Sequence, residues 1–407
     1  MFIFLTKILN KIAILIQRGS WFLLVLVFLA NGVMGQSYQI GHINATFIDS
    51  SRSNRLVPAE IYYPADVAGD NVAFASGITS KVPAISFGHG FFMTFDAYFN
   101  IRNAVVANGY IIAFPTTEGS LSPSHSEFGK DLAFVLKKVR DLGASSTSPL
   151  YNKVDSMNCV MGHSMGGGAS FLAASYDASI KSMVTFAAAE TSPTAIGAAA
   201  SISIPALVFA GLNDCISPPT TNQQPMYNAL TSACKHYIGI KGASHCQMAE
   251  TNLACNFGES SCTPAPSISM ATQHAIIDSY LIPWLDYTLK SSCTAGAYFE
   301  TKSASDTAIT VIKNCSLCGT TSAAIVSNNP LQLRLSPNPC TNKLGIEAPA
   351  FPNATIQVIS MTGTIILSES ISTTQHISTE NLPNGIYILV LSSPGFEVLH
   401  GVFEVRR

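Results

Sequence analysis

Residues 160–168 read Val160-Met161-Gly162-His163-Ser164-Met165-Gly166-Gly167-Gly168, which places a serine at the centre of a Gly-x-Ser-x-Gly pattern. An apolar run precedes the pattern and a helix-compatible run follows it, at residues 159–161 and 169–176. A serine on a sharp turn between a strand and a helix has strained backbone angles, so its neighbours must be small. The following helix would point its N-terminus at this serine. The pattern predicts a nucleophile, although by itself it also fits a glycine-rich turn without chemistry.

Outward from this turn, short apolar runs alternate with helical patterns between about residues 80 and 290. Buried strands of a parallel sheet are predicted at residues 82–87 and 110–114. Further strands are predicted at residues 181–188, 206–210 and 235–240. Helices are predicted at residues 98–107, 128–142, 224–233 and 267–290, and two alternating strands at residues 40–48 and 57–63. The alternation predicts a doubly wound, mostly parallel α/β sheet with its functional residues on loops at the carboxyl ends of strands.

Two of these loops carry the partners that a serine nucleophile requires. The hydroxyl needs a base within hydrogen-bond reach, and the base needs an acid that orients it. Asp214 follows the strand at residues 206–210, and His245 follows the strand at residues 235–240. The order serine, acid, histidine is that of the α/β-hydrolase arrangement. We therefore predict a Ser164, Asp214, His245 triad, with Glu190 and Asp177 as weaker candidates for the acid.

The loop after residue 87 is expected to complete an oxyanion hole. Its two donors would be the backbone N–H groups of Phe91 and Met165. Neighbouring aromatic residues, Phe92 and Phe95 among them, are predicted either to wall an apolar acyl site or to pack in the core. Glu190 is a candidate substrate-binding residue. The nine histidines lack metal-ligand spacing, and dinucleotide and phosphate-binding motifs are absent, so neither a metal nor a cofactor is predicted.

Composition and the N-terminus indicate an exported protein. Charged residues make up only 11% of the 407, which is typical of secreted chains, and a net charge of −2 gives no electrostatic case for nucleic acid. Lys7, Lys11 and Arg18 precede an apolar run at residues 21–30. This pattern predicts a signal peptide over residues 1–35, with a membrane anchor as the alternative. No later stretch is long and apolar enough to span a bilayer.

Nine of the ten cysteines lie beyond Asp214, and an exported chain can oxidise them to disulfides. Cys159, within a predicted buried strand, is expected to be a free core thiol. Cys255 and Cys262 are close enough in sequence to pair. Residues 291–330 are rich in Ser, Thr, Ala and Asn and read as a linker, in which the Cys315-Ser-Leu-Cys318 pattern predicts a disulfide staple rather than a zinc site. Residues 331–407 show short alternating strands and turn signals, which predict a small all-β sandwich.

Together these motifs resemble a known superfamily. Residues 38–290 resemble the α/β-hydrolases, and within them the branch with dienelactone hydrolases, chlorophyllases, bacterial cutinases and polyester (PET) hydrolases. The matching residues are 162–168, 209–214 and 242–245. The resemblance implies ester hydrolysis through an acyl-enzyme, and some relatives carry a disulfide that here would join Cys215 to Cys246. One departure is the loop at residues 188–192, where polyester hydrolases have a tryptophan and this chain has Glu190.

The last 75 or so residues resemble the C-terminal sorting domain of the type IX secretion system. The resemblance rests on Leu335-Ser336-Pro337-Asn338-Pro339, on residues 384–390 and on the terminal residues 403–407. It implies that the chain binds the secretion machinery and leaves the cell or remains on its surface. The alternative is a carbohydrate-binding or adhesive module.

The combined prediction is a secreted serine esterase or lipase: signal peptide, α/β-hydrolase domain at residues 36–290, linker and sorting domain. Its substrate would be an ester with an apolar acyl part. Two alternatives stay open: a polyester- or cutin-directed hydrolase, and a non-catalytic surface-binding protein on a hydrolase scaffold.

Overall fold

The computed structural model describes residues 38–318, 334–347, 354–360, 365–371, 376–392 and 399–407. The chain divides into two compact units, Met1–Thr320 and Thr321–Arg407, and each is described by itself. The predicted signal peptide lies outside the described residues. Among the described residues, no helix is both long and apolar enough to cross a membrane.

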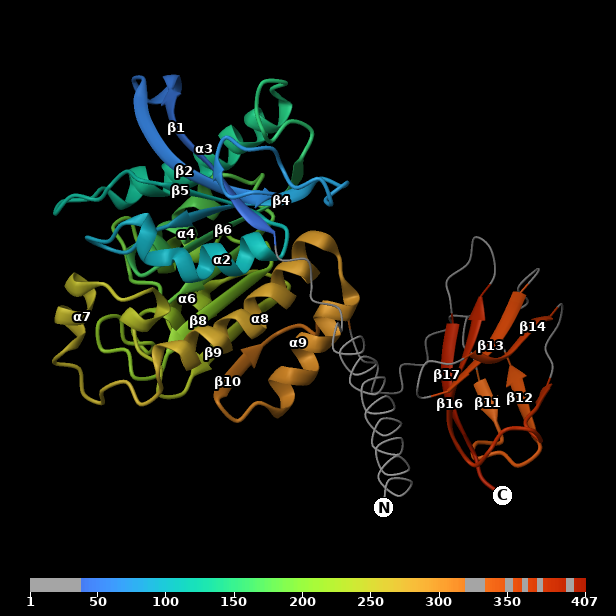
Figure 1. The fold of residues 1–407 in the computed structure, drawn as a ribbon. Helices are drawn as coiled ribbons and strands as arrows, with labels where there is room; N and C mark the ends of the chain where they lie inside the picture. Colours follow the sequence, from blue (N-terminus) through green and yellow to red (C-terminus); the bar gives the residue numbers. More distant parts are fainter. Residues whose placement is uncertain (1–37, 319–333, 348–353, 361–364, 372–375, 393–398) are drawn as a thin grey trace, which may run out of the picture. The chain divides into compact units, whose positions relative to one another are not determined.

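A ten-stranded sheet forms the centre of the first unit (Figure 1). Its six inner strands are all parallel, in the order β9-β8-β7-β6-β4-β5. Beyond β5, β2 pairs antiparallel with β5, β1 pairs antiparallel with β2, and the short β3 pairs parallel with β1 at the edge. At the other edge β10 pairs antiparallel with β9. The strands are β1 (Gln39–Asp49), β2 (Arg55–Ala65), β3 (Gly69–Asp70), β4 (Val82–Gly88), β5 (Ile111–Pro115), β6 (Val154–His163), β7 (Ser182–Phe186), β8 (Ala206–Gly211), β9 (Lys235–Ile240) and β10 (Ile309–Lys313). The predicted mostly parallel α/β fold is confirmed.

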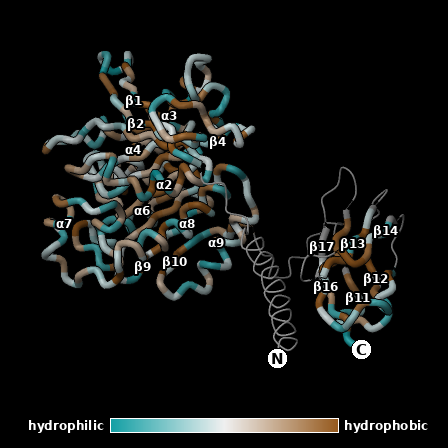
Figure 2. Tube along the Cα trace, viewed as in Figure 1, coloured by the Kyte–Doolittle hydropathy of each residue, from teal (hydrophilic) through white to brown (hydrophobic). Residues whose placement is uncertain are grey.

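Helices cover both faces of the sheet because the inner strands are apolar on both faces. Along β6, for example, Val160 packs into one core, and Cys159 and Met161 pack into the other. Figure 2 shows the hydrophobic residues gathered along these strands. One face packs against α3 (His125–Ala144), α4 (Met165–Tyr176), α5 (Ala195–Ala199) and α6 (Gln223–Ala229); the other packs against α2 (Phe99–Ala107), α8 (Met270–Lys290) and α9 (Cys293–Ser305). Helix α8 is one helix that contains Pro283.

The predicted linker over residues 291–330 is wrong for its first part, because residues 293–313 form α9 and β10 of the first unit. Strand β10 pairs with β9, and Phe299 and Leu317 are buried in the core. Both cysteines of the C-x-x-C pattern form disulfides, as predicted, although not with each other: Cys315 bonds to Cys234 and Cys318 bonds to Cys293. These bonds attach the segment to the sheet edge and to α9. Residues 319–330 lie outside the described part.

The second unit contains two antiparallel sheets, as the predicted sandwich requires. Three strands form one sheet, in the order β11 (Arg334–Ser336), β12 (Lys343–Glu347), β15 (His376–Ser378). Four form the other, in the order β14 (Ile365–Ile371), β13 (Ala354–Ser360), β16 (Gly385–Ser392), β17 (Leu399–Val405). Both sheets contribute to one core, with Leu344 from the first and Leu389 and Phe403 from the second. Strands β12 and β15 were not predicted from the sequence.

We predict that ending the first unit at Lys290 instead of Cys318 lowers its free energy of unfolding by at least about 3 kcal/mol. The shorter chain loses the buried Phe299, two disulfides and the edge strand β10. Guanidinium unfolding of the two lengths measures the difference, and Phe299→Ala in the longer one reports the packing part alone. Equal midpoints for the two lengths would restore the linker interpretation.

Candidate active site

Ser164 lies on the turn between β6 and α4, as the Gly-x-Ser-x-Gly pattern predicts. Its backbone angles are φ 54° and ψ −121°, a conformation that costs a non-glycine residue energy. Hydrogen bonds hold the turn: the Ser164 amide donates to the Phe186 carbonyl, and the Ser164 carbonyl accepts from Ala189 at 2.9 Å. The turn therefore presents the serine at the carboxyl end of the sheet, directly before the N-terminus of α4.

The glycines around Ser164 are required by close backbone contacts. A Cβ on Gly166 would lie 2.1 Å from the carbonyl oxygen of Gly88, and one on Gly162 would lie 2.2 Å from the carbonyl oxygen of Gly166. Neither separation leaves room for an additional carbon. Glycine at these positions lets the first turn of α4 rest directly on β4 and β6.

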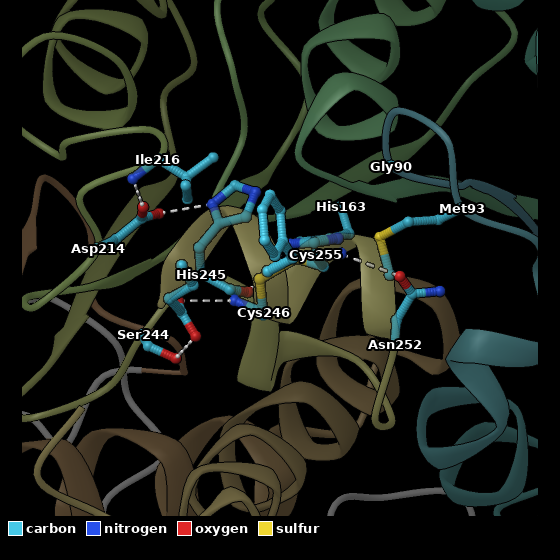
Figure 3. Close-up of a disulfide and its surroundings, with 12 residues drawn as sticks. Gly90, Met93, His163, Asp214, Ile216, Ser244, His245, Cys246, Asn252 and Cys255 are labelled. Atoms are coloured by element: carbon cyan, nitrogen blue, oxygen red, sulfur yellow. Dashed lines mark hydrogen bonds and ion pairs between the residues drawn. A yellow bond between two sulfur atoms is a disulfide. The ribbon is translucent and has the colours of Figure 1, made fainter. Parts of the chain in front are cut away.

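Asp214 and His245 form a buried, hydrogen-bonded pair. Nδ1 of His245 lies 2.8 Å from a carboxylate oxygen of Asp214, and both side chains are almost fully buried (Figure 3). The second carboxylate oxygen of Asp214 accepts from the amides of Ile216 and Ser217, at 2.8 Å each. Because a carboxylate accepts, Nδ1 carries the hydrogen, and the other ring nitrogen of His245 is then available as a base.

Ser164 and His245 line the same cavity of about 320 Å³. Its other walls are mostly apolar: Phe91, Phe92, Met93, Leu121, Ile216, Ala254, Cys255 and Gly258. Among the described residues no hydrogen bond joins the Ser164 hydroxyl to His245. Such contacts are often long in a ligand-free site and tighten only with substrate. The structure thus gathers a serine, a histidine and a carboxylate at one apolar opening.

A chain of buried hydrogen bonds joins the loop after β4 to the loop of His245. The Gly90 amide donates to the Tyr98 hydroxyl at 2.7 Å, and that hydroxyl lies 3.0 Å from Nδ1 of His163. Nε2 of His163 lies 3.1 Å from the carbonyl oxygen of His245. Since a carbonyl only accepts, Nε2 carries the hydrogen and Nδ1 accepts from Tyr98. Burial, together with the nearby His245, lowers the pKa of His163 well below its usual value, which keeps this ring neutral.

From the sequence, His163 is expected to have a packing role, and Tyr98 belongs to the aromatic residues expected either to wall the acyl site or to pack in the core. The structure gives both a second task, because they fix the loop of Phe91 relative to the loop of His245. A histidine next to the candidate nucleophile was the one available signal. His89, which follows β4, bonds to the backbone oxygens of Gly90 and Thr117.

The remaining predicted site residues separate into two groups. Phe91 and Phe92 line the cavity, and Met165 begins α4 directly after Ser164. Phe95 and Glu190 are not among the residues that line it. The ring of Phe95 packs near Phe99 and Phe114, and the Glu190 carboxylate accepts from the Ile196 amide at the start of α5. Phe95 therefore serves the core, and Glu190 serves a helix terminus.

The disulfides near the site differ from the expected pairings. Cys215 bonds to Cys262 and Cys246 bonds to Cys255, so neither a Cys215–Cys246 nor a Cys255–Cys262 bond forms. Both bonds attach the segment around α7 (Leu253–Glu259) to the loops of Asp214 and His245. Cys159 is a free, buried thiol, as predicted.

Glu259 and Gln273 hold the residues on either side of His245, and neither was predicted. The Glu259 carboxylate accepts from the Ser244 hydroxyl and from the Cys246 amide, at 3.0 Å each (Figure 3 shows Ser244 and Cys246). The side-chain amide of Gln273, on α8, bonds to both the amide and the carbonyl of Ser244. The histidine loop is thus fixed by two helices.

One group of side chains in the described part has the spacing of a metal site. The ligand atoms of Cys234, His236 and Cys315 lie within 4.8 Å of one another. The two sulfur atoms form a disulfide here and are not free to bind a metal.

Two regions of the chain match families of known proteins. Residues 50–261, just over half of the chain, match the family described as PET hydrolase-like. Residues 334–399 match the family described as secretion system C-terminal sorting domain. These two regions correspond to the sheet unit that holds Ser164 and to the β-sandwich unit.

Similar curated proteins include cutinases of Thermobifida. Cutinase 2 of Thermobifida cellulosilytica is 26% identical over 185 residues, which are 45% of this chain and 68% of that protein. Cutinase cut1 of Thermobifida fusca is 26% identical over 185 residues, which are 45% of this chain and 56% of that protein. Cutinase 1 of Thermobifida cellulosilytica is 34% identical over 102 residues, which are 25% of this chain and 37% of that protein. The second and third of these relatives are thus matched over less than two thirds of their length.

We predict that Tyr98→Phe lowers the free energy of unfolding by about 1–3 kcal/mol, because it leaves the Gly90 amide and Nδ1 of His163 buried without partners. Guanidinium unfolding measures the change, with Tyr151→Phe, on an exposed side chain, as the matched control. If both variants unfold at the midpoint of the parent, the hydrogen-bond chain does not hold these loops.

Proposed function

Because the chain belongs to the PET hydrolase-like family, we propose that its first unit cleaves carboxylic esters through Ser164, His245 and Asp214. The observation that carries the proposal is the arrangement at the cavity. A strained serine and a histidine that is hydrogen-bonded to a buried carboxylate line one apolar opening. The cutinases to which the chain is similar agree with an ester substrate.

Acylation would begin at the serine hydroxyl. Nε2 of His245 takes the hydroxyl proton while the Ser164 oxygen attacks the ester carbonyl carbon. Asp214 keeps the imidazole in the required tautomer and stabilises its positive charge. When the tetrahedral intermediate collapses, the ester C–O bond breaks, and His245 gives the proton to the departing alcohol. The acyl group then remains on Ser164.

Deacylation repeats these steps with water. His245 takes a proton from a water molecule, whose oxygen attacks the acyl carbon, and then returns the proton to the Ser164 oxygen as the acid departs. The oxyanion of both intermediates would be held by the backbone N–H groups of Met165 and Phe91. Met165 stands at the N-terminus of α4, where the helix dipole favours negative charge.

The cavity favours esters with an apolar acyl part. Phe91, Phe92, Leu121 and Ile216 border it, and the candidate polar residue Glu190 is not among its lining residues. Since apolar surface removed from water drives binding, longer acyl chains would gain affinity until the cavity is filled. Hydrolysis of a polymeric ester is the narrower form of this proposal.

The second unit accounts for where the enzyme acts. It is a sorting domain of the type IX secretion system, so the chain is exported. An exported hydrolase meets esters outside the cell, and its cysteines can remain oxidised there. The four disulfides of the first unit fit this location.

We predict that the exported chain hydrolyses p-nitrophenyl esters and that Ser164→Ala abolishes turnover, because no other group in the cavity replaces the attacking oxygen. Asp214→Asn is expected to lower kcat about a thousandfold or more, since the base loses its tautomer and its charge partner. Rates across acyl chains of two to sixteen carbons define the acyl preference.

Ser170→Ala is the matched control for these substitutions, because its buried hydroxyl on α4 bonds only to the Gly166 carbonyl among the described residues. Folded parent protein without activity on any of these esters would overturn the proposal and favour a non-catalytic binding protein. Turnover that survives Ser164→Ala would overturn the serine mechanism alone.

A further inference from the structure

Helix α7 presents two large apolar side chains to solvent. Leu253 is 86% exposed and Phe257 is 84% exposed, which is more than any other large hydrophobic residue in the described part of the chain. They are four residues apart and therefore lie on the same side of the helix. Exposed apolar side chains that gather at one place on a soluble unit mark an interaction site more often than scattered ones do.

The helix is firmly attached to the candidate triad. Its segment is bonded to Cys215 and Cys246, which directly follow Asp214 and His245 in the chain. Glu259, the last residue of α7, also accepts hydrogen bonds from both neighbours of His245. Anything that binds the outer side of α7 is thus held at a fixed place beside the site.

Helix α7 also forms part of the cavity wall. Ala254, Cys255 and Gly258 line the cavity that contains Ser164 and His245. Leu253 and Phe257 occupy the neighbouring side of the same helix, outside the cavity. The apolar surface therefore continues from the site over α7, and a molecule longer than the cavity would extend onto it.

We propose that the Leu253 and Phe257 side of α7 is a docking surface for an insoluble, uncharged polyester, one ester bond of which occupies the cavity. The proposal rests on the proposed ester hydrolysis and specifies how an extended substrate is held. A cavity of about 320 Å³ is near the lower limit for ligand sites, so most of a polymer chain must lie outside it.

The charges within the segment that contains α7 favour this occupant over an anionic membrane. Residues 244–270 contain no Lys or Arg, and their only acidic residues are Glu250 and Glu259. Surfaces that bind anionic lipid headgroups use clusters of basic residues, which this segment lacks. A neutral polyester offers no charge, and its apolar backbone suits exposed Leu and Phe side chains.

The test compares adsorption and hydrolysis on two kinds of substrate. In the full chain carrying Ser164→Ala, binding to polycaprolactone nanoparticles is measured with and without Leu253→Ser and Phe257→Ser. Removing both side chains is expected to weaken adsorption at least tenfold. The parent chain removes the apolar surface of Leu253 and Phe257 from water on docking, and the serine variant has much less apolar surface to remove. In the chain that retains Ser164, the same pair is expected to lower particle hydrolysis similarly and to leave kcat/KM on p-nitrophenyl butyrate within twofold.

A matched control is available on the β1–β2 hairpin. Ile48 and Leu56 face each other there and are 58% and 60% exposed, and neither lines the cavity. Changing both to Ser is expected to leave adsorption and hydrolysis unchanged.

Three results would overturn the docking surface while leaving ester hydrolysis intact. The first is that the Leu253→Ser, Phe257→Ser variant adsorbs to polyester as tightly as its parent. The second is that its binding to phosphatidylcholine vesicles falls as much as its binding to polyester. The third is that the parent is a dimer in gel filtration and the variant is a monomer. Absence of p-nitrophenyl butyrate hydrolysis by the parent would instead overturn the proposed function, whereas the adsorption result would still be read from the Ser164→Ala chain.

Discussion

The site depends on one constraint: the backbones of β4, β6 and α4 are in direct contact, with no side chain between them. Gly88, Gly162 and Gly166 approach one another so closely that a Cβ on either of the last two would lie about 2 Å from a carbonyl oxygen. The contact brings the N-terminus of α4 to the sheet and holds Ser164 at a positive φ. It also places the loop after β4, which carries Phe91, beside the serine. The sheet order then brings the loops after β8 and β9, with Asp214 and His245, to the same edge.

The hydrophobic pattern predicted the inner strands, and the ends of those strands indicated the triad candidates. Apolar runs are strands, and their carboxyl ends meet at one edge, so the sequence order of Ser164, Asp214 and His245 was enough to choose them. Helix α9 escaped prediction because most of its residues are small or polar, and strand β10 because it is a run of only five residues within a polar stretch. Both take their place in the fold through pairing of β10 with β9 and burial of Phe299. The disulfide partners were not predictable either. Cys215 and Cys246 directly follow Asp214 and His245, which suggested that they bond to each other, but each bonds instead to a cysteine in the segment around α7. The carboxylate of Glu190, proposed from the sequence as a substrate-binding group, accepts from the Ile196 amide six residues further along the chain and is not among the residues that line the cavity.

The loops of the acid and the base are held by independent means. A disulfide follows each of Asp214 and His245, the Glu259 and Gln273 side chains fix Ser244, and His163 fixes the carbonyl of His245. Loops are usually the mobile part of an α/β unit, whereas catalysis requires side chains that are already in position. Covalent attachment resolves this conflict in a chain that is exported to an oxidising environment. It also gives α7 a fixed place beside the cavity. The same segment then supports the loop of His245 and presents its outer side to the proposed polyester.

A base at His245 would make the Ser164 hydroxyl reactive, and covalent labelling detects such a serine. The folded chain is treated with a fluorophosphonate, which modifies serines that a neighbouring base activates, and intact mass and peptide mapping locate the label. We predict one label per chain, on the peptide that contains Ser164, and none after Ser164→Ala. A folded chain that stays unlabelled, or that carries the label on another residue, would contradict it.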